Sequence, residues 1–119
     1  MKLAVSAKGP GLDSEVDPRF GRAKYIIVVD EESLDFEAMD NSANANAFKG
    51  AGIQAATMVS GKGAQVLLTG YCGPKAFQVL AAADIKVASD VTGTVREAVA
   101  AHRQGQLAYT DSANAEAHW

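Results

Sequence analysis

Short apolar runs separated by polar or glycine-rich segments divide the N-terminal third of the chain. The runs at 2–7, 25–30 and 34–40 predict three strands. The second is continuously apolar and β-branched, whereas the third alternates apolar with acidic residues, as in a half-solvated antiparallel strand. A long loop from 8 to about 22 precedes the second strand, and a short turn at 31–33 follows it. We therefore expect the last two strands to form a hairpin.

The pattern changes to alternating helix and strand after a polar loop at 41–50. Helices are predicted over 51–60, 74–82 and 95–104, with strands over 65–69 and 85–88. Pro74 suits a first helical position because its missing N–H would be unpaired there. Thr94 and Glu97 have the spacing of a capping box, which starts the last helix. Strands joined through helices are parallel, with right-handed crossovers.

This order, βββαβαβα, predicts an α/β fold of ribonuclease-H-like type. The economical solution is a mixed five-stranded sheet in spatial order 3-2-1-4-5 with helices on its faces. We expect one domain over residues 1–108 and a polar C-terminal tail over 109–119, which includes His118. The first and fourth strands then form a switch point, where open α/β sheets bind ligands. The glycine-rich loops at 8–11 and 70–73 are expected to meet there.

Composition narrows the class of protein. The 119 residues are 48% apolar and 21% charged, which fits one globular domain. The net charge of -3 argues against a nucleic-acid or anionic-membrane binder. The single cysteine excludes an internal disulfide and an all-cysteine metal cage, and fits a reducing compartment. Because the sequence shows no signal peptide and no membrane-spanning apolar run, a cytoplasmic location is expected. A monomer is also expected, because the sequence shows no conspicuous exposed apolar stripe that would indicate an obligate dimer.

Glycines precede three of the predicted helices, and this is the candidate chemistry of the chain. Helix N-termini that converge on one edge favour an anionic ligand, and cations in nearby loops add charge-assisted contacts. The structural alternative is that each glycine only permits a tight turn. The candidate site residues are Arg19, Arg22, Gly50, Gly52, Gly70, Tyr71, Cys72, Gly73, Lys75, Gly93 and Thr94.

Cys72 has two interpretations. Its position just before a helix start predicts an exposed thiolate with a lowered pKa, able to ligate a metal, whereas free cysteines are more often small buried hydrophobes. His102, on the apolar face of the last helix, is expected to be a structural histidine. No histidine or cysteine has a partner at metal-ligand spacing, so a mononuclear site built from protein ligands alone is not expected. The first and fourth strands carry no carboxylate, which excludes two-metal nuclease chemistry.

Several motifs resemble the dinitrogenase iron–molybdenum cofactor biosynthesis family over about residues 1–108. The most specific are Asp17-Pro-Arg-Phe-Gly-Arg22 and Gly50-Ala-Gly52, and Lys2-Leu-Ala-Val-Ser, Leu68-Thr-Gly70, Gly73-Pro-Lys-Ala-Phe77 and Gly93-Thr-Val-Arg-Glu-Ala98 agree. Some relatives carry iron–sulfur or iron–molybdenum cofactor precursors. Others, the orange proteins of sulfate-reducing bacteria, are similar in size and hold a molybdenum–copper sulfide cluster. The resemblance implies a cofactor carrier, not an enzyme. Unlike some carriers, this chain has no histidine in its loops.

Three hypotheses of different classes follow. In the first, the chain carries an anionic metal–sulfide cluster over Gly70–Gly73 and Gly93–Thr94, held by backbone N–H groups, Arg19, Arg22, Lys75 and Cys72. In the second, the same turns bind phosphate or a nucleotide, although the sequence has neither Gly-x-Gly-x-x-Gly nor a Walker motif. In the third, the chain is a regulatory adaptor whose only ligand is a protein. A cofactor-accepting protein is a possible partner in the first case.

Overall fold

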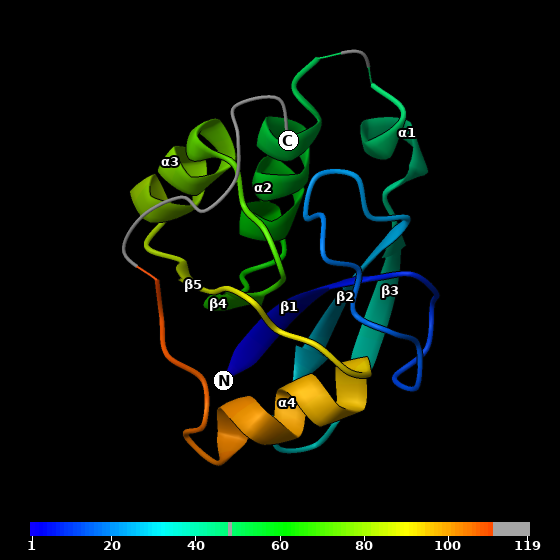
Figure 1. Cartoon of the computed structure of the whole chain (residues 1–119), viewed down its shortest axis with the longest axis vertical. Coiled ribbons are helices and arrows are strands. Elements are labelled where there is room, and N and C mark those ends of the chain that lie inside the picture. The colour runs from blue at the N-terminus through cyan, green and yellow to red at the C-terminus, as the bar shows by residue number, and fades with distance from the viewer. Residues whose placement is uncertain (48, 111–119) are drawn as a thin grey trace.

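The computed structural model describes residues 1–47 and 49–110, and its centre is a five-stranded mixed sheet in the order β3-β2-β1-β4-β5 (Figure 1). β2 pairs antiparallel with both β1 and β3, and β4 runs parallel to β1 and β5. The predicted α/β class and sheet order are confirmed. The strands are β1 (Lys2–Ala7), β2 (Tyr25–Asp30), β3 (Phe36–Asp40), β4 (Val66–Leu68) and β5 (Lys86–Ala88).

Four helices accompany the sheet, and three of them lie where the sequence predicted. These are α2 (Ala51–Gly61), α3 (Pro74–Ala82) and α4 (Val95–Arg103). The fourth, α1 (Ser42–Ala45), is a single turn in the segment predicted as loop. It forms because the Asp40 carboxylate accepts the Ser42 N–H at 2.8 Å and the Asn41 carbonyl accepts the Ala45 N–H at 2.8 Å. A four-residue turn has too few positions to show a helical period.

The third strand begins later than predicted, at Phe36 instead of residue 34. Leu34 has a φ of 64°, in the left-handed region, so it belongs to the turn. The Asp30 carboxylate accepts the N–H groups of Glu32 and Ser33 at 2.9 and 3.0 Å, and the Asp30 N–H donates to the Asp35 carbonyl. The hairpin turn therefore extends to residue 35, and the alternating pattern alone did not reveal its length.

Each face of the sheet has its own hydrophobic core. Figure 1 shows α2 and α3 together on one face and α4 on the other. The α2–α3 core includes Phe20 from the long loop, Ala55 and Val59 from α2, and Leu80 from α3. The α4 core includes Val95 and Val99 from α4 and Leu12 and Val16 from the same long loop. The loop between β1 and β2 thus contributes apolar side chains to both faces.

The end of the described chain returns to the free edge of β5. Thr110 donates its N–H to the Val87 carbonyl at 2.7 Å, and the two residues form an isolated antiparallel bridge. The predicted tail begins at 109, so residues 111–119, with His118, lie outside the described residues. Within 1–47 and 49–110, no helix is long and apolar enough to cross a membrane.

Candidate functional site

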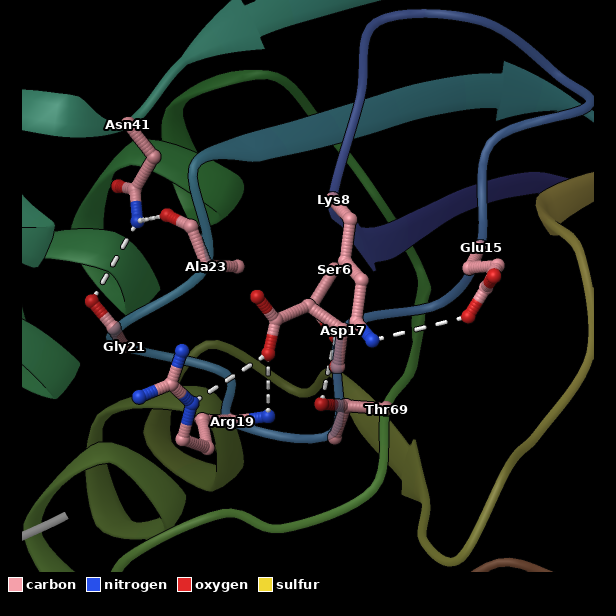
Figure 2. A network of polar contacts seen from close by, with 9 residues as sticks. All are labelled: Ser6, Lys8, Glu15, Asp17, Arg19, Gly21, Ala23, Asn41 and Thr69. Carbon is pink, nitrogen blue, oxygen red and sulfur yellow. Dashed lines mark hydrogen bonds and ion pairs between the residues drawn. The ribbon is translucent and has the colours of Figure 1, made fainter.

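The loop between β1 and β2 fills the predicted switch point. Asp17 donates its N–H to the Ser6 carbonyl at 2.9 Å, and the Ser6 hydroxyl donates to the Asp17 carbonyl at 2.7 Å. The Ser6 hydroxyl also shares a hydrogen bond of 2.7 Å with the Thr69 hydroxyl across β1 and β4 (Figure 2). All three residues are buried, at most 4% exposed. Polar side chains therefore join the loop to the carboxyl ends of both central strands.

The loop segment that meets the β4–α3 turn is 17–20, not the predicted glycine-rich stretch 8–11. The Tyr71 N–H donates to the Pro18 carbonyl at 2.6 Å, and the Phe20 N–H donates to the Tyr71 carbonyl at 3.2 Å. A Cβ added to Gly70 would lie 2.7 Å from the Cα and carbonyl oxygen of Pro18. Gly70 is therefore needed for close approach of two backbones, while Gly9 faces Ser14 instead.

The same loop then reaches the start of α2. A Cβ on Gly21 would lie 2.6 Å from the backbone nitrogen of Gly52 and 2.7 Å from its Cα. The Asn41 side-chain amide donates to the carbonyls of Ala23, at 2.8 Å, and Gly21, at 3.4 Å (Figure 2). The predicted motifs 17–22 and 50–52 are thus in direct contact, with glycine on both sides.

The N-termini of α2 and α3 are open, by which we mean that their first N–H groups have no acceptor in the described parts of the chain. For α3 these are the N–H groups of Gly73, Lys75 and Ala76, and for α2 those of Ala51, Gly52 and Ile53. Neither helix has a side-chain cap. Because β1, β3, β4 and β5 point the same way, both helices begin at the carboxyl edge of the sheet. Such donors suit an anion.

The N-terminus of α4, by contrast, is closed by the chain itself. Thr94 and Glu97 form the predicted capping box, with bonds of 2.9 and 3.1 Å. The next N–H groups also have acceptors: Val95 donates to the Ser14 carbonyl and Arg96 to the Leu12 carbonyl, at 2.9 and 2.8 Å. Gly93, with a φ of 90°, accepts a bond from the Val16 N–H through its carbonyl. Gly93 and Thr94 therefore belong to the cap of α4, and the Thr94 N–H is already bonded to the Glu97 carboxylate.

The predicted cations have different roles. Arg19 forms an isolated bridge with Tyr71, which places it beside the start of α3, and its side chain is 49% exposed. Lys75 is exposed in the first turn of α3. Arg22 instead donates through Nη1 to the carbonyls of Ala45 and Ala47, both at 2.8 Å. Arg22 thus holds the segment before α2 in place, and its expected contact with an anion stays a prediction.

Asp17 is the site residue that the sequence analysis did not single out. Its side chain is 6% exposed, and its Oδ1 accepts the Arg19 N–H at 2.9 Å and lies 3.6 Å from the Arg19 Nε (Figure 2). The spacing Asp-Pro-Arg is the available signal, because an aspartate before proline favours a turn in which it caps the N–H two residues on. A carboxylate therefore lies among the donors expected to bind an anion.

The expectation of an exposed, low-pKa thiolate at Cys72 is wrong. The residue is 1% exposed in the α2–α3 core, and burial raises the pKa of its thiol to about 12. Desolvation disfavours the thiolate more than the helix start favours it. The alternative interpretation, a small buried hydrophobe, is confirmed. Cys72 is consequently a poor metal ligand at neutral pH.

No protein-ligated metal centre is evident in the described residues. They contain no group of three or more histidine, cysteine, aspartate or glutamate side chains that could hold a metal ion. His102 is engaged by Glu31 at 3.1 Å and by the Tyr109 hydroxyl at 2.9 Å, as expected for a structural histidine.

The fold and the site define a small α/β protein whose long loop and two open helix N-termini surround the carboxyl edge of its sheet. The chain belongs to the dinitrogenase iron-molybdenum cofactor family, whose sequence pattern matches residues 1–105. The predicted family is confirmed.

Individual relatives agree with this membership. The apo form of the orange protein from Desulfovibrio gigas is 50% identical, with 96% of each chain covered and a TM-score of 0.93. A Thermotoga protein of the DUF35 family is 34% identical over 96% of this chain and 97% of that one, with a TM-score of 0.82. An uncharacterized protein of Methanocaldococcus jannaschii is 26% identical over 110 residues, 90% of this chain and 89% of that protein. Family and fold point to handling of a cofactor.

Proposed function

We propose that this protein carries an anionic metal–sulfide cluster without covalent attachment. The observation that carries the proposal is the pair of open N-termini of α2 and α3 at one edge of the sheet, beside Arg19 and Lys75. Each helix start favours a nearby negative charge by about 0.3–1 kcal/mol at exposed sites. The absence of a metal-ligating cluster among the described side chains suits a cargo that supplies its own sulfide ligands.

The cargo that the relatives suggest is a molybdenum–copper sulfide cluster, with an iron–sulfur or iron–molybdenum precursor as the alternative. Identity of 50% to the orange protein favours the first. The residues proposed to hold it are Gly50 and Gly52 at the α2 start, Gly73 and Lys75 at the α3 start, and Arg19. Gly70, Tyr71 and Cys72 shape the turn before α3, and Arg22 positions the segment before α2. We place Gly93 and Thr94 outside the site because the capping box and the carbonyls of the long loop already accept the N–H groups of residues 94–97 at the α4 start. The protein then acts as a carrier, not a catalyst, and delivers its cargo to an acceptor protein.

The decisive experiment is a visible spectrum with elemental analysis on protein purified anaerobically from its native host. An intense charge-transfer band with stoichiometric molybdenum and copper, or with iron, would support the proposal and name the cluster. Colourless, metal-free protein that also fails to take up tetrathiomolybdate with copper would overturn it. Thermal protection by phosphate but not by tetrathiomolybdate would then favour the phosphate hypothesis, because the same N–H donors suit both anions. Neither kind of protection, together with a stable protein partner, would favour the adaptor hypothesis.

A further inference from the structure

Asp17 places a negative charge inside the proposed anion site, and this is unexpected for a site built to attract anions. The carboxylate is almost fully enclosed, with a 6% exposed side chain, at the end of β1 where the loop crosses toward α3. Within the described residues, the only cationic group within ion-pairing distance of it is the guanidinium of Arg19, whose Nε is 3.6 Å away. A buried carboxylate lowers the local positive potential that an anion would feel.

Arg19 therefore has two competing partners. Its N–H is fixed to the Asp17 Oδ1 at 2.9 Å (Figure 2). Its side chain is half-exposed, and its backbone bridges Tyr71, just before the open start of α3. An anion bound at α3 would attract the same guanidinium that Asp17 now neutralises. We propose that Asp17 sets the strength with which the site holds its anion, by competing with that anion for Arg19. This inference rests on the proposed function and assigns to Asp17 the role of keeping binding reversible.

The structural role of Asp17 can be separated from its charge. Its two bonds to Ser6 use the main-chain N–H and carbonyl, so they do not depend on the side chain. An asparagine at this position keeps an oxygen able to accept the Arg19 N–H and removes only the charge. Asp17→Asn is therefore a conservative test, whereas Asp17→Ala would also remove the hydrogen bond.

Glu15 offers a matched control in the same loop. Its carboxylate is 73% exposed and pairs with Lys8 at 3.6 Å, away from Arg19 (Figure 2). Glu15→Gln changes the net charge by the same amount as Asp17→Asn. A general electrostatic effect would therefore appear in both variants, whereas competition for Arg19 would appear only in Asp17→Asn. Exposed charges are also strongly screened by salt.

The experiment measures dissociation constants of the wild type and both variants for tetrathiomolybdate and, separately, for sulfate, together with thermal unfolding. We expect Asp17→Asn to bind about tenfold more tightly and Glu15→Gln to change by less than about twofold. Thermal stability of Asp17→Asn should be unchanged or lower. A purely structural role for the carboxylate predicts the opposite, because binding would then weaken together with stability.

The outcomes separate the two proposals. If the wild type binds tetrathiomolybdate but Asp17→Asn binds it no more tightly, or if Glu15→Gln gains as much, the inference about Asp17 is overturned and the carrier proposal stands. If the wild type binds sulfate but not tetrathiomolybdate, the cargo is wrong, and the sulfate constants of the two variants still test the competition. If the wild type binds neither anion, both proposals are overturned.

Discussion

The N-termini of α3 and α4 look alike in sequence and differ in structure. Both helices follow a glycine at the carboxyl edge of the sheet, in the segments Gly70–Gly73 and Gly93–Thr94. At α4 the capping box and two carbonyls of the long loop accept the first N–H groups, whereas those of Gly73, Lys75 and Ala76 at α3 have no acceptor in the described chain. The lesson is that a helix start binds an external anion only if the protein has not already supplied the acceptors.

The largest expected effect comes from Gly70→Ala, which acts on the α3 side of this comparison. The new Cβ would lie 2.7 Å from main-chain atoms of Pro18, which cannot move as a flexible side chain could. We expect the free energy of unfolding to fall by about 3 kcal/mol. Urea unfolding measures this. Gly61→Ala is the control, because its Cβ would have no neighbour within 4 Å. The control should gain about 0.5–1 kcal/mol from helix propensity. Equal effects of the two substitutions would contradict the interlock between loop and turn.

The second effect appears at high pH and concerns Cys72, which lies just before the open start of α3. The folded pKa is raised to about 12, so above the ordinary thiol pKa of 9.0 the unfolded chain loses this proton while the folded chain keeps it. Stability is thus fully present below pH 9 and falls by about 1.4 kcal/mol per pH unit as the pH rises toward 12. Cys72→Ala should show a shallower decline in denaturant unfolding between these values. Parallel declines of the two proteins would indicate that the open helix start keeps the thiol pKa low after all.

Thr94→Ala tests the closed start of α4. The substitution removes the hydroxyl that accepts the Glu97 N–H at 3.1 Å, and it should lower the free energy of unfolding by about 1 kcal/mol. Tetrathiomolybdate binding, measured well below the melting temperature, should not change. Weakened binding in this variant would return Gly93 and Thr94 to the site.

Arg19→Ala should give the smallest change in stability. In contrast to Thr94→Ala, it should weaken anion binding more than it lowers the free energy of unfolding. Its guanidinium is half-exposed and 3.6 Å from Asp17, so its loss should cost no more than about 1 kcal/mol. Retention of tetrathiomolybdate should nevertheless fall severalfold. Arg22→Ala is the informative comparison, because it removes two hydrogen bonds of 2.8 Å to the segment before α2. The free energy of unfolding of Arg22→Ala should fall by about 1–3 kcal/mol. Unchanged retention of tetrathiomolybdate in Arg19→Ala would remove Arg19 from the proposed site.

Much of the fold was predictable because its signals are local. β1, β2 and α3 begin and end at the predicted residues, since apolar periodicity, the β-branched run and Pro74 act within a few positions. The capping box of α4 was equally local. The single turn of α1 and the later start of β3 escaped because each depends on a carboxylate, from Asp40 and Asp30, that accepts neighbouring N–H groups.

The site was predicted less well because its features depend on contacts between distant segments. The sequence placed Arg19, Gly52 and Gly70 near the carboxyl edge, and the loop does bring Arg19 to Tyr71 and Gly21 to Gly52. Nothing local to Thr94 showed that carbonyls of the long loop would close the α4 start. The burial of Cys72 likewise depends on packing by α2 and α3, which outweighs its position beside a helix.

The two backbone contacts of the long loop also have a consequence for the timing of assembly. Gly21 meets Gly52, and Pro18 meets Gly70, so each contact joins segments that leave the ribosome far apart in time. Contacts of large sequence separation form late in folding because the intervening chain must first be closed into a loop. The proposed anion site is therefore complete only after the chain has been synthesised beyond the start of α3. Under the proposed carrier function, loading of the cargo is therefore a step that follows the joining of these distant segments.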